Sequence, residues 1–299
     1  MRNRRASWAM VWVGALVGCS ADPGVLRVGA YAVREERGAR QTPTGDRVEY
    51  TLFVPQPTEG MPGPPRPAVV LMHGFARDKG FHKYNAVHLA SRGFVVLTPD
   101  GVSLLSGETG QRRNISNAVD HVRWLQQRSE TPGDSLFERV DVARIGLAGH
   151  SAGGAIVFEA AIDGENLDFP VQAVCLLDAV PWSRTLNRAA EFPAIALASF
   201  RSEPSSCNAD GKVRDLLALL PAVVEDIRIV GASHCSPENP SDSLCPLACG
   251  GDDRQARELY QRLMYLFLRD ALGAERFEGD SESFEAALDE LAAEGRIAR

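Results

Sequence analysis

The stretch Gly149-His150-Ser151-Ala152-Gly153-Gly154 decides the fold of this 299-residue chain because of the patterns on either side of it. The apolar run at 144–148 is typical of a buried strand, and residues 151–161 are typical of a helix. A strand that turns this sharply into a helix leaves room only for glycine or a very small residue two positions before and two after the corner. Both positions are glycine here, so the pattern predicts that Ser151 projects from the carboxyl end of a strand, at the start of a helix.

The same alternation of strand and helix continues along most of the chain. Strands are predicted at 68–72, 94–97, 144–148, 171–177, 194–198 and 226–230, after an alternating strand at 48–54. The runs at 68–72 and 94–97 are continuously apolar, as is typical of strands buried on both faces of a parallel sheet. Helical patterns lie at 84–92, 114–128, 151–161 and after Asp253. Strands that alternate with helices imply right-handed crossovers, so we predict an α/β fold with a mostly parallel central sheet and helices on both faces.

The composition favours a single globular domain and argues against nucleic-acid binding. The chain is 44% hydrophobic and 24% charged, and a length near 300 residues is enough to bury one large core. The formal net charge is −7, and three arginines lie in the N-terminal segment described next, which leaves the remainder more acidic. A protein that binds phosphate backbones carries the opposite balance, so nucleic acid is not an expected partner.

Residues 1–19 have the pattern of an export signal. Arginines at positions 2, 4 and 5 precede an apolar run at 8–17, which is shorter than the about 20 residues needed to span a bilayer. Leu16-Val17-Gly18-Cys19 resembles the bacterial lipobox, which implies that Cys19 is acylated, becomes the first mature residue and anchors the protein in a membrane. Ser20 favours the outer membrane, facing the periplasm or the cell surface. A plain signal peptide with an incidental Cys19 is the alternative.

A serine needs a base within hydrogen-bond reach to become a nucleophile, and histidine has the appropriate pKa. Of the six histidines, only His234 follows Ser151 in the sequence. It lies just beyond the predicted strand at 226–230, in a loop that would reach the same edge of the sheet as Ser151. We therefore predict that His234 is the general base.

Three carboxylates could orient that histidine. Asp178 directly follows the predicted strand at 171–177, and Glu203 and Asp210 follow the next strand, at 194–198. All three would reach the carboxyl edge of the sheet, and only geometry distinguishes them. We favour Asp178 and keep Glu203 and Asp210 as alternatives.

The developing oxyanion of an acyl transfer needs two backbone N–H donors. The first would be the amide of Ala152, directly after the nucleophile. The second would be the amide of Phe75, in the loop His73-Gly74-Phe75 that follows the strand at 68–72. Trp182, four residues after Asp178, could form the floor of a substrate cleft, although ordinary packing also explains an aromatic residue at this position.

Export would allow disulfides, which changes the interpretation of the cysteines. Cys175 lies inside a predicted buried strand and is expected to be unpaired. The other four can form two disulfides in three ways, and they are Cys207, Cys235, Cys245 and Cys249. We favour Cys207–Cys235 with Cys245–Cys249, because the first pair would join two loops at the expected site. A zinc site of four thiolates is the alternative, but the spacings lack paired CxxC motifs, and no metal is expected.

Several of these motifs together resemble the chlorophyllase branch of the α/β-hydrolases, whose relatives include platelet-activating-factor acetylhydrolases and cutinase-like polyester hydrolases. The motifs are Leu71-Met72-His73-Gly74-Phe75, the segment 84–100, the glycine-rich corner at Ser151 and Leu177-Asp178-Ala179-Val180-Pro181. In chlorophyllases the acid follows the strand after the corner helix, which favours Asp178. Cutinase-type enzymes bridge the loops that carry acid and base, and Cys207 lies three residues before Asp210, which keeps Asp210 as an alternative.

The resemblance implies a domain organisation and an activity. Residues 20–47 would be a linker with a possible first strand, 48–272 the α/β-hydrolase domain, and 273–299 an acidic helical tail. The expected activity is that of a serine esterase that forms an acyl-enzyme on a small-molecule or lipid-like ester, with no cofactor. A thioesterase or peptidase could use the same residues. A surface lipoprotein could also retain the scaffold only for binding.

Overall fold

The computed structural model describes residues 29–56, 63–102, 107–165, 171–222, 224–251, 253–276 and 280–299. The predicted export signal and Cys19 lie outside these residues. Within the described part, no helix is both long enough and apolar enough to cross a membrane.

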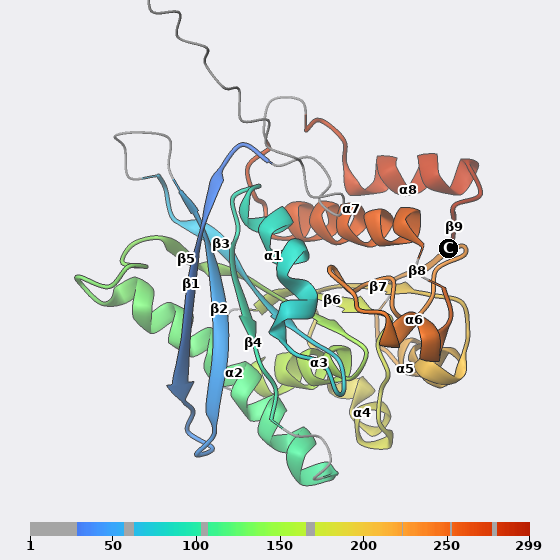
Figure 1. Ribbon diagram of the computed structural model, residues 1–299, viewed down its shortest axis with the longest axis horizontal. Coiled ribbons are helices and arrows are strands. Elements are labelled where there is room, and N and C mark those ends of the chain that lie inside the picture. Colours follow the sequence, from blue (N-terminus) through green and yellow to red (C-terminus); the bar gives the residue numbers. More distant parts are fainter. Residues whose placement is uncertain are drawn as a thin grey trace, which may run out of the picture.

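The described residues form one sheet of nine strands with the order β1-β2-β4-β3-β5-β6-β7-β8-β9 (Figure 1). The strands are β1 Ala32–Gln41, β2 Arg47–Gln56, β3 Arg66–Met72, β4 Val95–Pro99, β5 Val140–His150, β6 Val171–Leu177, β7 Ala196–Arg201, β8 Glu225–Ile229 and β9 Ile297–Ala298. The six strands from β4 to β8 in this order are parallel. Antiparallel strands flank them on both sides, with β1 and β2 at one edge and β9 at the other. Parallel neighbours direct their carboxyl ends to one edge of the sheet, where the predicted site residues follow the strands.

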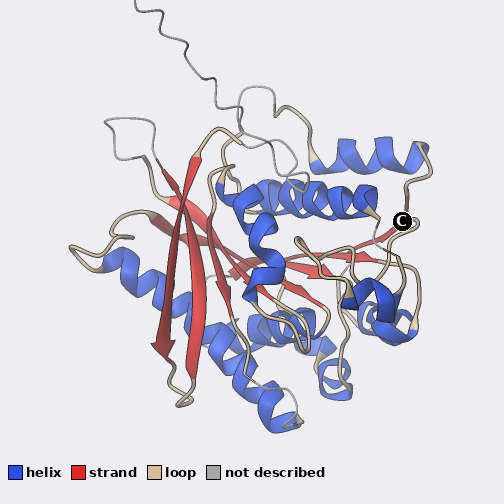
Figure 2. Cartoon of the chain, in the orientation of Figure 1, coloured by secondary structure: helices blue, strands red, loops and turns tan. Residues whose placement is uncertain are grey.

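Helices cover both faces of this sheet (Figures 1 and 2). They are α1 Lys83–Ala90, α2 Glu108–Glu130, α3 Ala152–Glu165, α4 Ser183–Asn187, α5 Val213–Leu217, α6 Leu244–Cys249, α7 Arg254–Ala271 and α8 Phe284–Ala293. One hydrophobic core lies between the sheet and helices α2 and α3, and a second lies between the sheet and helices α1, α7 and α8. The predicted α/β-hydrolase architecture, a mostly parallel sheet between two helical layers, is therefore confirmed.

The sheet extends past both ends of the range 48–272. Strand β1 pairs with β2 along its whole length, in register from Ala32 opposite Gln56 to Gln41 opposite Arg47. At the other end, α8 buries Phe284 and Leu288 against the rest of the core, and Ile297 of β9 pairs with Ile229. The apolar side of the C-terminal helix therefore docks on the domain, where Figure 1 shows α8 beside α7.

Several buried histidines make stability depend on pH. Desolvation by burial lowers the pKa of His82 and of His121 to about 3, against an ordinary value of 6.5. Between these pKa values the unfolded chain binds protons that the folded chain does not. The free energy of unfolding is therefore unaffected by these two histidines above pH 6.5 and decreases as the pH falls toward 3. We expect the free energy of unfolding to fall by roughly 3 kcal/mol per pH unit between about pH 6 and pH 4 from these two groups.

Urea unfolding at a series of pH values measures this slope. Arg40 lies 2.9 Å from His121 Nδ1, and the amide oxygen of asparagine can accept the same hydrogen bond. His121→Asn removes one of the two titrating groups and should roughly halve the slope. A free energy of unfolding that stays level across this range in the wild type would contradict the expectation.

Candidate active site

Ser151 occupies the corner between strand β5 and helix α3. Its φ of 55° lies in the left-handed region that side chains disfavour, and the surrounding hydrogen bonds hold it there. Its N–H donates to the carbonyl of Leu177 at 3.1 Å, and its own carbonyl accepts from Gly154 and Val180, both at 3.0 Å. The strained corner is thus tied to the end of β6 and to the loop that follows it.

The two glycines around the corner are required by close backbone contacts. A Cβ on Gly149 would lie 2.3 Å from the carbonyl oxygen of Gly153, and a Cβ on Gly153 would lie 2.5 Å from the carbonyl oxygen of His73. Both distances are far below van der Waals contact, and the atoms met are backbone atoms that cannot rotate away. These contacts explain why both positions must be glycine, as the sequence pattern predicted.

The structure brings Ser151, His234 and Asp178 together. His234 Nε2 lies 2.9 Å from Ser151 Oγ, and His234 Nδ1 lies 2.6 Å from Asp178 Oδ2. The three residues come from the ends of β5, β8 and β6, and their exposed fractions are 8%, 7% and 1%. In this arrangement Nδ1–H donates to the carboxylate, which leaves Nε2 free to accept the serine proton.

The carboxylate of Asp178 is held by donors that the sequence analysis did not identify. Ser202, the first residue after β7, donates its N–H to Oδ1 at 2.8 Å and its hydroxyl to Oδ2 at 2.7 Å. Asn208 Nδ2 lies 3.4 Å and 3.3 Å from the same two oxygens. Such donors stabilise the ionised carboxylate in a buried position. No spacing in the sequence marks Ser202 as a partner of Asp178, because the two residues follow different strands.

The two alternative acids lie elsewhere. Glu203 forms an ion pair at 2.6 Å with Arg228 of strand β8. Asp210 is exposed, in a turn with a φ of 57°. The hydrogen bond with His234 is made by Asp178, because β6 lies next to β5 and ends beside the corner.

His150 supports the loop that carries His234. Its Nε2 lies 2.8 Å from the backbone carbonyl oxygen of His234, to which it donates. Burial, followed by the nearby His234, lowers the pKa of His150 well below its ordinary value, so the ring is neutral. Behind it, Glu238 is 1% exposed and accepts two hydrogen bonds from Arg77, at 2.6 Å and 2.5 Å. Residue 150, which directly precedes Ser151, thus links the corner to the histidine loop.

The loop His73-Gly74-Phe75 lies against Ser151. A Cβ on Gly74 would lie 3.0 Å from Ser151 Cβ, and Phe75 is 50% exposed beside it. His73 fixes the loop, because its Nδ1 lies 2.8 Å from the Gly74 carbonyl oxygen and its Nε2 accepts from Gly101 N at 2.8 Å. These contacts use both nitrogens of His73 for structure.

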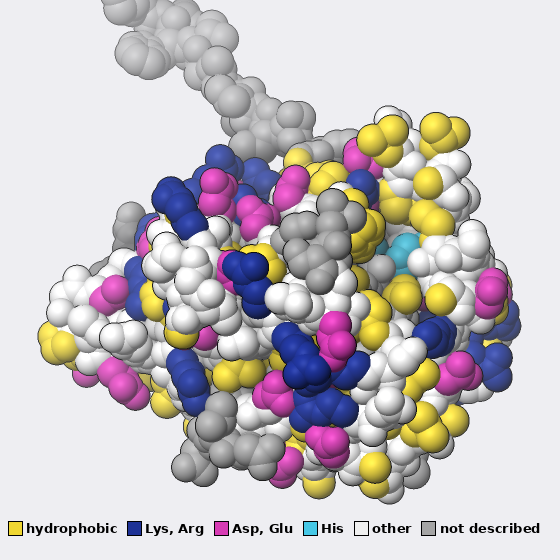
Figure 3. All heavy atoms as spheres, turned by 90° about the horizontal axis from the view of Figure 1, so that it is seen from below, with side chains coloured by type: hydrophobic (Ala, Val, Ile, Leu, Met, Phe, Trp, Pro, Cys, Tyr) yellow, Lys and Arg dark blue, Asp and Glu magenta, His cyan; other side chains and the backbone are white. Residues whose placement is uncertain are grey.

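The three residues Gly74, Ser151 and His234 line an open cleft of about 240 Å³. In Figure 3, hydrophobic side chains gather around a histidine that is visible at the surface. Trp182 lines a neighbouring hollow together with Val180, whose N–H donates to the Ser151 carbonyl. The indole is half-buried and packs against the core on the α2 and α3 side, so the structure places Trp182 beside the Ser151 cleft and not in its lining.

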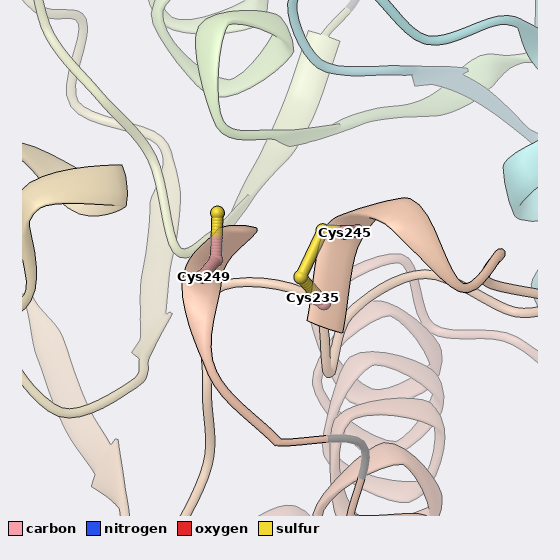
Figure 4. Close-up of side chains that lie close together, drawn as sticks. All are labelled: Cys235, Cys245 and Cys249. Carbon is pink, nitrogen blue, oxygen red and sulfur yellow. A yellow bond between two sulfur atoms is a disulfide. The ribbon is translucent and has the colours of Figure 1, made fainter. Parts of the chain in front are cut away.

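The disulfides differ from the favoured pairing. Cys207 pairs with Cys249 and Cys235 pairs with Cys245, so the predicted pairs Cys207–Cys235 and Cys245–Cys249 are wrong. Cys245 and Cys249 are one turn apart on the same side of helix α6, and two loops meet that side. Each cysteine is bonded to the loop nearest to it, as Figure 4 shows for Cys245 and Cys235. Cys175 is buried and unpaired, as predicted.

The cysteine cluster also bears on the zinc alternative. Sulfur atoms of Cys235, Cys245 and Cys249 lie within 4.8 Å of one another, close enough to share a metal ion. Zinc binds thiolates, and all three sulfurs are bonded to other sulfurs here. In this oxidised state the cluster joins three segments of chain.

A mostly parallel sheet with a serine at a strand-to-helix corner, and with a histidine and a carboxylate arriving from later strands, defines an α/β-hydrolase. Within that class the chain belongs to the Chlorophyllase family, whose pattern matches residues 23–203. It is also similar to a bis(hydroxyethyl) terephthalate hydrolase of Streptomyces coelicolor, with 36% identity over 94 residues. That match covers 31% of this chain and 28% of the relative's length.

Proposed function

We propose that this protein hydrolyses carboxylic esters through a Ser-His-Asp triad. The observation that carries the proposal is the continuous chain of hydrogen bonds from Ser151 Oγ to His234 at 2.9 Å and from His234 to Asp178 at 2.6 Å. Membership of the Chlorophyllase family and similarity to a terephthalate ester hydrolase support an ester as the substrate class.

In the first half of the reaction, Ser151 Oγ attacks the ester carbonyl carbon while His234 Nε2 takes the hydroxyl proton. The carbonyl oxygen becomes an oxyanion, which the amides of Phe75 and Ala152 would stabilise. When the tetrahedral intermediate collapses, the bond to the alcohol oxygen breaks, and His234 returns the proton to that oxygen. The alcohol leaves, and the acyl group stays on Ser151.

In the second half, a water molecule gives a proton to His234 and attacks the acyl carbonyl. Collapse of the second intermediate breaks the bond to Ser151 Oγ, which takes the proton back, and the carboxylic acid leaves. Asp178 orients the imidazole throughout and stabilises its charged form. Its buried position with donors from Ser202 and Asn208 suits this role.

We also propose that the chain is exported and anchored through an acylated Cys19, as the sequence pattern at 16–19 indicates. Two disulfides support this proposal, because such bonds persist in oxidising compartments. An anchored hydrolase would meet its substrate at or near a membrane surface.

Incubation of the purified protein with 4-nitrophenyl acetate and with a fluorophosphonate probe tests the ester hydrolase directly. We expect release of nitrophenolate with saturable kinetics and covalent labelling of one serine, identified by mass spectrometry as Ser151. Heat-unfolded protein serves as the control for nonspecific acyl transfer. Absence of both hydrolysis and labelling would contradict the proposal and favour a scaffold that only binds.

A further inference from the structure

Helix α6, Leu244–Cys249, is not held in place by a hydrophobic core. None of its residues is buried, and its two leucines are among the most exposed large apolar side chains described, with Leu244 at 67% and Leu247 at 84%. Exposed leucines on a six-residue helix contribute no packing energy to the fold. Large apolar side chains kept in water often mark a surface that binds something apolar.

Covalent bonds and charges hold this helix instead. Cys245 is bonded to Cys235, the neighbour of His234, and Cys249 is bonded to Cys207, the neighbour of Asn208. The helix is thus linked to the loop of the proposed base and to the loop that contacts the carboxylate of Asp178.

The start of α6 is fixed as well. Asp242 Oδ1 accepts from the N–H groups of Leu244 and Cys245, both at 3.0 Å, and the same carboxylate forms an ion pair with Arg77 at 3.0 Å. Arg77 in turn holds Glu238 in the histidine loop. The position of the helix relative to His234 is therefore determined from both of its ends.

The helix forms one side of the cleft that contains the nucleophile. Leu244 and Ala248 line this cleft together with Ser151, and Phe75 lines it from the loop after β3. The cleft volume of about 240 Å³ is below the about 300–1,000 Å³ of common ligand pockets. An ester with a long apolar group exceeds this volume, and the exposed apolar side chains of α6 at the cleft's edge offer a surface along which the group could continue.

We propose that α6 is the binding wall for the apolar group of the ester, with Leu244 contacting it inside the cleft and Leu247 contacting it beyond the rim. The inference rests on the proposed ester-hydrolase function and specifies its substrate class as esters with long or bulky apolar groups. The two disulfides make the wall rigid, so little ordering is needed when the substrate binds.

Selectivity for acyl length tests the wall. We expect Leu244→Ser and Leu247→Ser to lower kcat/KM for 4-nitrophenyl octanoate by about tenfold and about threefold, because each removes apolar contact area. The loss for 4-nitrophenyl acetate should be several-fold smaller, since the two esters share the nitrophenyl group and only the octanoyl chain is long enough to extend along the helix. Leu219→Ser is the matched control, because Leu219 is 53% exposed and does not line the cleft. Equal losses on both esters, or no loss on octanoate, would overturn the inference.

A second measurement does not depend on catalysis. The full-length protein is irradiated with a diazirine analogue of octanoic acid, and the adducts are mapped by mass spectrometry. Adducts on residues 244–249 that disappear in Leu244→Ser are expected. Such adducts in a protein without hydrolytic activity would retain the wall and reject the proposed function. Hydrolytic activity with adducts only elsewhere would retain the function and reject the wall.

Discussion

Replacing Ser151 with alanine is expected to lower kcat for 4-nitrophenyl acetate by at least about 10⁴-fold and to abolish labelling by a fluorophosphonate. The hydroxyl that His234 Nε2 contacts at 2.9 Å is the atom that would form the acyl-enzyme, so its removal leaves only binding and oxyanion stabilisation. Folding should be little affected, because alanine keeps the Cβ and the backbone hydrogen bonds that hold the corner, and removes only the hydroxyl.

Steady-state assays, together with burst-phase kinetics, measure the loss of kcat. The midpoint of thermal unfolding checks that the variant is folded. Ser281→Ala, a change at an exposed serine before α8, is the matched control and should leave kcat unchanged. Persistent labelling of the Ser151→Ala protein would move the nucleophile to another residue and would reject the mechanism.

Asp178→Asn is expected to lower kcat by about 10⁴-fold while changing KM little. The carboxylate accepts a hydrogen bond from His234 Nδ1 at 2.6 Å, which keeps Nε2 unprotonated toward Ser151. An asparagine can turn its amide N–H₂ toward Nδ1, and the imidazole then holds its proton on Nε2, where it cannot accept one from the serine.

The two rejected acids provide matched controls for this prediction. Glu203→Gln breaks an ion pair with Arg228, and Asp210→Asn changes an exposed side chain, so kcat should stay within about twofold in both. A large loss in either control together with a small loss in Asp178→Asn would assign the orienting role to the other carboxylate. Steady-state kinetics on the three variants, with unfolding curves for each, make the comparison.

The glycine-rich corner at Ser151 could be predicted from the sequence because its residue pattern is local. Gly149 meets backbone atoms of Gly153 in the same turn, and the glycine pattern lies within six residues. The backbone that Gly153 meets, at Met72 and His73, belongs to a segment far away in the sequence. His234 could be predicted for a different reason, since it alone among the histidines follows the corner and lies after the last parallel strand.

The supporting residues could not be predicted in this way. Ser202 and Asn208 reach Asp178 because β7 lies next to β6 and the following loop folds back over the carboxylate. His150 reaches the His234 carbonyl across 84 residues of sequence. Such contacts depend on which loops lie next to each other in the folded protein, and the spacing of residues in the sequence does not show this.

The choice among the three carboxylates and the pairing of the cysteines also depend on contacts between distant segments. The order of strands in the sequence predicted three carboxylates at one edge of the sheet. Asp178 lies 2.6 Å from the imidazole of His234 because β6 is adjacent to β5 in the folded sheet. The number of cysteines available for pairing was evident from the chain, but α6 was not predicted. The two loops that lie against α6 decide that Cys245 pairs with Cys235 and Cys249 with Cys207.

The sequence by itself determined the strand and helix order, the glycine-rich corner and the identities of Ser151 and His234 as candidates, because these follow from local sterics and from hydrophobic periodicity. The tertiary structure alone decided which carboxylate meets the histidine, which cysteines pair and that an exposed helix lines the cleft. Those outcomes depend on distances between segments that are far apart in the chain, and such distances are set only when the sheet and its loops pack together.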